Sequence, residues 1–176
     1  MPMEKWDKCK VAFDEDDLAG HVCYGGLDLS STTDITAFVL VFPPTEDDEH
    51  YYVLSYFWLP EETLPLRVRR DHVPYDIWER QGYLKTTEGN VVHYGFIENF
   101  IDELGQKFHI KEIAFDRWGA VQMSQNLEGL GFTMVQFGQG YKDTSPTLDI
   151  NASTCSLFGG SAISSVIFKM ITAFSG

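Results

Sequence analysis

Three segments of strand-like composition follow one another early in the chain, and their order constrains the fold more than any other feature. Residues 25–42 hold two β-rich runs separated by the turn-forming residues 30–34, a pattern typical of a β-hairpin. A third run at 51–59 is rich in aromatic residues, which favour strands. We therefore expect three consecutive antiparallel strands.

Helical and strand-like segments alternate in the next part of the chain. Helix signals, including apolar residues that recur at helical spacing, lie at 60–70, 75–81, 96–108 and 120–130. The clearest apolar stripe consists of Phe96, Ile97, Phe100, Ile101, Leu104 and Phe108. Short strands are predicted at 111–116 and 133–137. The order predicts an α/β fold in which a mixed sheet continues from three antiparallel strands into βαβ crossovers, with flanking helices.

The charge balance limits the functions open to this chain. Its 176 residues carry 26 acidic and 13 basic side chains, a formal net charge of −13. A protein that coats DNA passively needs clustered lysine and arginine, so that class is excluded. A nuclease remains open, because metal ions can supply positive charge at the reacting phosphate. No GxxxxGK[ST] motif occurs, which excludes a P-loop ATPase within this chain.

Cysteine usage and hydropathy point to a reducing compartment. The three cysteines are widely spaced and odd in number, which argues against a disulfide scaffold, and no CxxC or HExxH motif suggests zinc. The first ten residues lack the apolar core of a secretory signal, and the apolar late stretch is interrupted by Lys169. We expect a cytoplasmic protein without a membrane span.

Two aspartates stand out as candidate metal ligands. Asp28 lies between Leu27 and Leu29 in the first strand, and Asp116 ends the strand predicted at 111–116. In a sheet of this order these two strands are normally neighbours, which would bring two carboxylates together. Two carboxylates so close together disfavour ionisation of both groups unless a divalent cation lies between them. Oxygen ligands suit Mg²⁺ or Mn²⁺.

A structural interpretation of both aspartates stays open beside the catalytic one. Asp28 precedes a serine-rich turn and can serve as a turn residue, and Asp116 can cap the helix predicted at 120–130. Asp34 is the nearest competitor to Asp28, and we interpret it as part of the turn.

Several motifs, in order along the chain, carry a family resemblance. They lie at residues 25–34, 56–62, 73–78, 88–92, 112–118 and 137–146. Over roughly residues 6–147 the chain resembles the C-terminal nuclease domain of the large terminase subunit of tailed phages, which has a ribonuclease H-like fold. The resemblance divides the chain into three parts. Residues 1–22 would be a polar lead-in or linker from an ATPase domain, residues 23–147 the nuclease domain, and residues 148–176 an atypical tail.

The resemblance also implies an activity and its partners. The family's nuclease is a metal-dependent endonuclease that cuts concatemeric double-stranded DNA during genome packaging, and Asp28 and Asp116 match its first two metal-binding acids. The implied cofactor is Mg²⁺ or Mn²⁺ in a two-metal site. The implied partners are double-stranded DNA, the N-terminal ATPase domain, the small terminase subunit and the portal, in the cytoplasm of a bacterial host.

One departure from the family concerns its third acid, which lies near the C-terminus. The chain leaves the family pattern at about Leu148, and its only late carboxylates, Asp143 and Asp149, are poor substitutes. We therefore expect the second ion to be held weakly and the nuclease activity to be weak or absent. A second departure is His93, where many relatives carry an acid, and we interpret it as a surface or cap position.

Basic residues suggest where DNA would lie. Arg67, Arg69 and Arg70 form the only compact basic cluster, although pairing with nearby acids such as Asp71 is the simpler interpretation for at least two of them. Arg117 and Lys142 each follow a predicted strand at the side where Asp116 lies. The candidate DNA contacts are therefore Arg117, Lys142, Arg67 and Arg70.

Two further functions compete with the terminase nuclease. One is another ribonuclease H-like enzyme, such as a ribonuclease H or a junction resolvase, because fold alone does not fix the substrate. The other is a non-catalytic prophage remnant that keeps the fold and only docks with partners of the packaging motor. Metal binding at Asp28 and Asp116 distinguishes a nuclease from a pure docking module.

Overall fold

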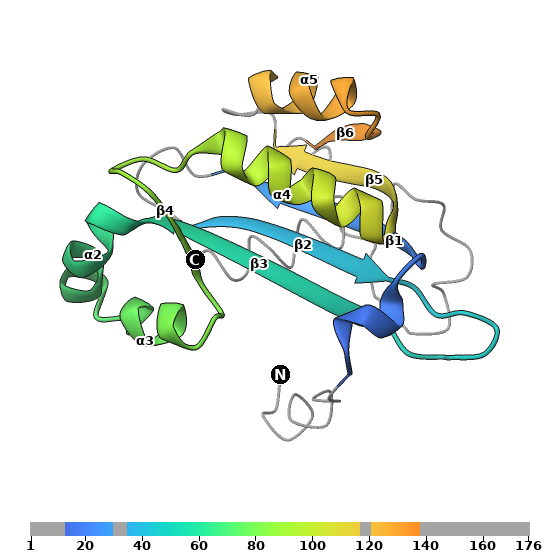
Figure 1. Cartoon of the computed structure of the whole chain (residues 1–176), viewed down its shortest axis with the longest axis horizontal. Coiled ribbons are helices and arrows are strands. Elements are labelled where there is room, and N and C mark those ends of the chain that lie inside the picture. The colour runs from blue at the N-terminus through green and yellow to red at the C-terminus, as the bar shows by residue number, and fades with distance from the viewer. Residues whose placement is uncertain (1–12, 30–34, 117–120, 138–176) are drawn as a thin grey trace, which may run out of the picture.

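A computed structural model of the chain describes residues 13–29, 35–116 and 121–137. Its centre is a six-stranded mixed sheet with the strand order β4-β3-β2-β1-β5-β6 (Figure 1). The strands are β1 (Val22–Asp28), β2 (Thr36–Phe42), β3 (Tyr52–Pro60), β4 (Lys85–Thr87), β5 (His109–Asp116) and β6 (Met134–Phe137). The helices are η1 (Glu15–Leu18), η2 (Glu61–Thr63), α2 (Leu64–Asp71), α3 (Tyr75–Arg80), α4 (Tyr94–Lys107) and α5 (Val121–Gly129).

The strand pairing confirms the predicted mixed sheet. Strands β1, β2 and β3 are consecutive and antiparallel, whereas β5 is parallel to both β1 and β6. The sequence pattern did not predict β4, which has three residues and pairs in parallel with β3. A run this short has no visible alternation of apolar and polar residues, so only the neighbouring strand identifies it.

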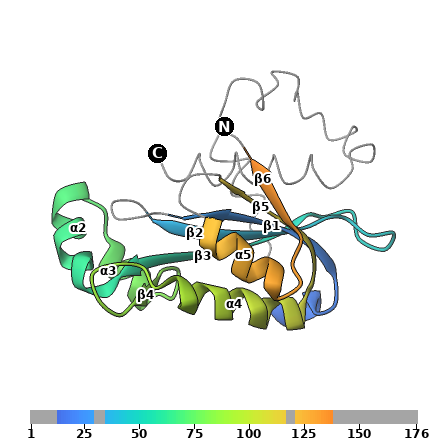
Figure 2. The same cartoon turned by 90° about the horizontal axis from the view of Figure 1, so that it is seen from above.

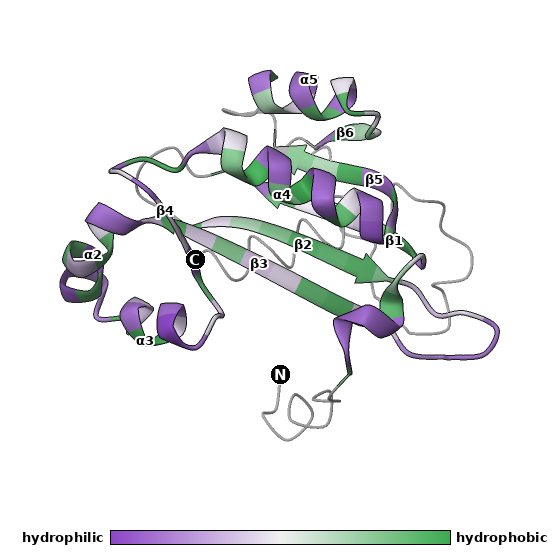
Figure 3. Ribbon diagram, viewed as in Figure 1, coloured by the Kyte–Doolittle hydropathy of each residue, from purple (hydrophilic) through white to green (hydrophobic). Residues whose placement is uncertain are grey.

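The main core lies between the sheet and helices α4 and α5, which cover the same face (Figure 2). Ile97, Ile101 and Leu104 of α4 are buried there, as the apolar stripe predicts. Phe96 belongs to the predicted stripe but is 50% exposed, because Ile97 takes the inward position of that helical turn. Figure 3 shows the same division along α4, with apolar and polar residues on different sides of the helix.

Strand β2 is buried on both faces. Phe38, Leu40 and Phe42 belong to the main core, while Ala37, Val39 and Val41 form a second cluster on the other face. Every residue of the strand is buried, as expected for a central strand.

Gly25 lets three central strands pack closely. A Cβ at this position would lie 3.1 Å from Ile113 Cγ1 on β5 and 3.1 Å from Phe38 Cε2 on β2. A larger residue would push these core side chains away, which explains a glycine in the middle of a buried strand.

The acidic run before β1 is more structured than a solvated lead-in. Residues 15–18 form η1, whose last residue, Leu18, is buried in the main core. Lys107 at the end of α4 binds both Asp16, with 2.6 Å between Nζ and Oδ1, and Glu15, with 3.1 Å between Nζ and Oε1. The Gly20 N–H donates to the Lys107 carbonyl oxygen at 2.8 Å. The acidic run therefore stays largely exposed at Asp14, Asp16 and Asp17, while one buried leucine and one lysine anchor it to the domain. We call this contact the Lys107 clasp.

Within the described ranges, the helices are too short or too polar to span a bilayer.

Candidate functional site

The two candidate metal ligands occupy corresponding positions on neighbouring strands. Leu27 of β1 pairs with Phe115 of β5 in a parallel ladder, so Asp28 and Asp116 are the next residues along each strand. On their outer sides, Asp28 pairs with Ala37 of β2, and Asp116 pairs with Phe137 of β6. Carboxyl ends of parallel strands are the usual place for a ligand in an α/β sheet.

The face that Asp28 occupies follows from its neighbours. Leu27 and Phe115 both lie in the core beneath α4 and α5. Because side chains alternate along a strand, Asp28 lies on the opposite face, where Ala37 begins the second apolar cluster. Asp28 is partly buried at the end of its strand on that face.

The donor set fits a hard cation in part. Carboxylate oxygens are the ligands that Mg²⁺ and Mn²⁺ prefer, and the strand register supplies two aspartates in adjacent positions. Among the described residues, however, no group of three histidine, cysteine, aspartate or glutamate side chains is arranged to hold a metal ion. The side chain of Asp116 lies outside the described part, as do Asp34, Asp143 and Asp149.

Comparison with known proteins decides the family. Residues 1–153 match the model for the terminase large subunit, endonuclease domain. This chain belongs to that family. It is 41% identical over 128 residues to the large terminase subunit of Enterobacteria phage HK97, an alignment that covers 72% of this chain and 25% of that protein.

The structural comparison agrees with the sequence match. The crystal structure of the HK97 bacteriophage large terminase superposes with a TM-score of 0.70 at 35% identity, covering 88% of this chain and 32% of that one. The mixed sheet of this terminase nuclease domain is thus the ribonuclease H-like fold that the resemblance implied. The chain spans between a quarter and a third of the length of these relatives.

The structure describes two of the four candidate DNA contacts, Arg67 and Arg70. Arg67 is only 4% exposed, so the prediction that it contacts phosphates is inconsistent with its place on the inner side of α2. Arg70 is exposed but forms two bonds to the Asp71 carboxylate, Nε to Oδ1 at 2.5 Å and Nη2 to Oδ2 at 3.1 Å. Hydrogen bonding from Arg70 lowers the pKa of Asp71. Arg117 and Lys142 lie outside the described residues.

One smaller prediction about a single residue is confirmed. His93 is exposed at the N-cap position of α4 and makes no side-chain capping bond, as expected of a surface or cap residue. Trp58 is fully buried in the main core of the terminase domain. Trp78 is 39% exposed and contacts the ring of Tyr75.

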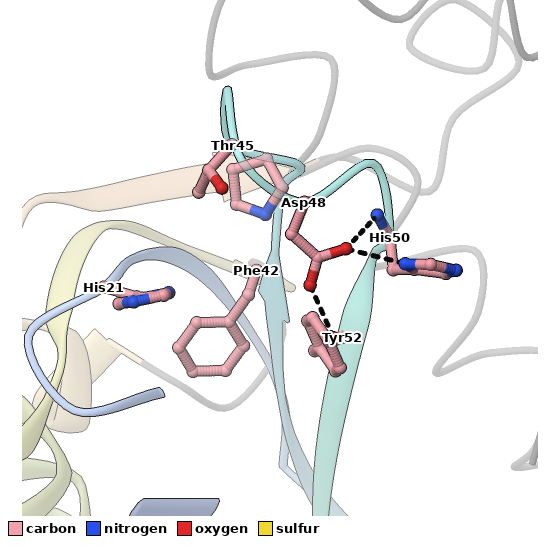
Figure 4. Close-up of a pocket in the computed structure, with 7 residues that line it drawn as sticks. His21, Phe42, Thr45, Asp48, His50 and Tyr52 are labelled. Atoms are coloured by element: carbon pink, nitrogen blue, oxygen red, sulfur yellow. Dashed lines mark hydrogen bonds and ion pairs between the residues drawn. The ribbon is translucent and has the colours of Figure 1, made fainter. Parts of the chain in front are cut away.

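A small pocket that the sequence did not reveal lies at the other end of the sheet, at the loop that joins β2 to β3. Its lining residues are His21, Phe42, Pro43, Thr45, Asp48, His50 and Tyr52 (Figure 4). Asp48 Oδ1 accepts from the His50 backbone N–H at 3.0 Å and lies 2.6 Å from His50 Nδ1, while Oδ2 accepts from the Tyr52 hydroxyl at 2.6 Å.

These bonds stabilise the ionised carboxylate and lower the pKa of Asp48 to about 2, with the Tyr52 bond as the largest cause. The same bond raises the pKa of Tyr52. The cluster links Asp48 to His50 and Tyr52 at the opposite end of the sheet from Asp28 in this terminase domain.

Proposed function

We propose that this chain is the metal-dependent endonuclease domain of a phage or prophage large terminase, which cuts concatemeric double-stranded DNA during genome packaging. One observation carries the proposal. Leu27 and Phe115 pair on the two central parallel strands, and Asp28 and Asp116 are the residues that follow them. Family membership favours this activity over a ribonuclease H or a junction resolvase.

Asp28 and Asp116 are the residues that would hold Mg²⁺ or Mn²⁺. When bound, such ions generate a nucleophile from water and stabilise charge on the oxygens around phosphorus. The chain's own contribution is positional, because the β1–β5 ladder fixes the backbone of both aspartates. Asp28 is half-buried, and its backbone also pairs with Ala37 of the fully buried strand β2.

The expected partners follow from the family. They are double-stranded DNA, an ATPase domain preceding this region, the small terminase subunit and the portal, in the cytoplasm of a bacterial host. The relatives are three to four times longer than the region they share with this chain, which supports a role as one part of a larger motor.

A specific observation favours a second candidate, a docking module without catalysis. The described residues bring together two carboxylate positions and no third metal ligand. With two acids the second ion would be held weakly, so we expect weak cleavage from this chain alone.

Plasmid cleavage with Mn²⁺ tests the proposal. The experiment compares the wild-type chain with Asp28→Asn and Asp116→Asn, and uses Asp47→Asn as a matched control because Asp47 is exposed in the loop at the opposite end of the sheet. We expect slow nicking by the wild type and the control and none by the two strand variants. Cleavage that survives in Asp28→Asn contradicts the assigned site. A folded wild-type chain that does not cut supports the docking module.

A further inference from the structure

The basic residues of the described chain are concentrated in one part of the fold. Residues 61–87, from η2 through β4, contain five basic and five acidic side chains, whereas the rest of the described chain contains two basic and sixteen acidic ones. We call residues 61–87 the α2–α3 lobe. It is a neutral region on a strongly acidic protein, so a polyanion meets the least repulsion there.

The lobe lies at the same end of the sheet as the paired aspartates. Asp28 pairs with Ala37 of β2, Ala37 pairs with Phe57 of β3, and the next residue, Trp58, pairs with Lys85 of β4. Three strand spacings separate β1 from β4, about 14 Å. Figure 1 shows α2 and α3 together beyond the end of β3, at the opposite end of the molecule from η1.

The lobe has a core of its own that holds its surface in place. Leu59, Leu64, Tyr75 and Leu84 are buried together, and Phe57 packs against both this cluster and the second apolar cluster of the sheet. Because Phe57 and Ala37 are a direct antiparallel pair, they share the face of Asp28. The lobe is therefore fixed beside the face on which Asp28 lies.

Burial and pairing identify the cations of the lobe that remain available. Arg67 is buried, and Arg70 is bonded to Asp71 through two nitrogens. Arg69 is exposed and forms no ion pair within the described ranges. Lys85 is exposed, and its Nζ lies 5.1 Å from the centre of the Phe100 ring, a contact that leaves its charge unneutralised.

We infer that duplex DNA contacts this domain through the α2–α3 lobe, with Arg69 and Lys85 as phosphate-binding residues. The inference rests on the proposed nuclease function and extends it to the surface that positions the substrate. A duplex advances about 34 Å per turn, so β4, about 14 Å from β1, lies within half a turn of a duplex bound at Asp28.

Duplex binding in EDTA tests the inference separately from cleavage. A fluorescent duplex is titrated with the wild-type chain, Arg69→Gln, the double variant Arg69→Gln/Lys85→Gln and the control Lys111→Gln, from 50 to 200 mM salt. Lys111 is exposed, lies outside the lobe and forms no ion pair among the described residues, so its variant makes the same change in net charge. Circular dichroism confirms that each variant is folded.

We expect Arg69→Gln to weaken binding threefold to tenfold, the double variant to weaken it more than tenfold, and Lys111→Gln to change it less than twofold. The slope of log K against log salt is negative, and each lost phosphate contact reduces its magnitude by about 0.9, so the double variant should reduce it by about 1.8. Equal effects for Arg69→Gln and Lys111→Gln, or no measurable binding by the wild type at 50 mM salt, overturn the inference. Unchanged binding by the double variant also overturns it and leaves the lobe as a protein-binding surface. Cleavage that fails while these binding differences persist refutes the nuclease and leaves the DNA surface standing.

Discussion

Leu27 lies directly opposite Phe115 in the parallel β1–β5 ladder, and this pair sets Asp28 and Asp116 side by side in the backbone. Two carboxylates in neighbouring strand positions repel each other when both are ionised, and a divalent cation removes that repulsion. The proposed metal site therefore predicts that metal binding and folding stability are linked at this point.

Asp28→Asn should raise the melting temperature in EDTA, because it removes one of the two like charges. Addition of Mn²⁺ should raise the melting temperature of the wild type, since a ligand that binds only the folded state stabilises it, and should have little effect on the variant. Differential scanning fluorimetry measures both effects, with Asp47→Asn as the control. Equal stabilisation of the wild type and Asp28→Asn by Mn²⁺ would show that the ion binds elsewhere.

Two glycines of α4 should respond in opposite ways to alanine. A Cβ at Gly105 would lie 2.6 Å from Phe132 Cζ, whereas a Cβ at Gly95 meets no atom within 4 Å. Gly95→Ala should stabilise the domain by up to about 1 kcal/mol through helix propensity. Gly105→Ala should destabilise it by about 1 kcal/mol, because the Phe132 ring packs against the main core and must shift. Urea unfolding measures both, and Gly105→Ala/Phe132→Leu should recover part of the loss.

The Lys107 clasp should control local opening of the segment before β1. Lys107→Met removes the ion pairs to Glu15 and Asp16, which are partly exposed, so the global free energy of unfolding should fall by less than about 1 kcal/mol. The Gly20 amide, which donates to the Lys107 carbonyl, should nevertheless exchange with solvent severalfold faster. Hydrogen exchange measured by NMR compares this variant with Lys111→Met. Unchanged exchange at Gly20 would mean that Leu18 alone holds the segment.

Asp48 should titrate at an unusually low pH. Its pKa is lowered from 3.8 to about 2, so its contribution to stability is fully present above about pH 4 and is lost as the pH falls toward 2. Carbon NMR of the carboxyl group measures the titration directly. Tyr52→Phe removes the largest cause, the 2.6 Å hydroxyl bond, and should move the pKa of Asp48 back toward its ordinary value. A titration of Asp48 that is the same in both proteins would contradict this assignment.

Strong local patterns made the sheet and the main helices predictable from sequence. The alternation Leu27-Asp28-Leu29 and the stripe on α4 each report one local periodicity, and both predicted the correct element. The adjacency of β1 and β5 was predicted from the order of elements, and the ladder confirms it. That the two aspartate side chains bind a metal ion stays a prediction.

The errors arose where tertiary contacts decide the outcome. Arg67 follows Leu64 by three residues, so both lie on the inner side of α2, a relation that the clustering of basic residues in the sequence does not reveal. Leu18 is a single apolar residue after a run of acids, and nothing local shows that it reaches the core. The three-residue strand β4 exists only through its pairing with β3.

The strand order also has a consequence for how the domain folds. The hairpins β1–β2 and β2–β3 join residues close in sequence, whereas the β1–β5 ladder joins Leu27 to Phe115 and must close a loop of nearly ninety residues. Closing such a loop has a high entropic cost before any contact compensates for it, and long-range parallel pairing is slow. A chain that has formed only its antiparallel strands therefore has Asp28 without Asp116 beside it. The two acids come together only when the long-range ladder forms, so an incompletely folded chain cannot assemble the paired site.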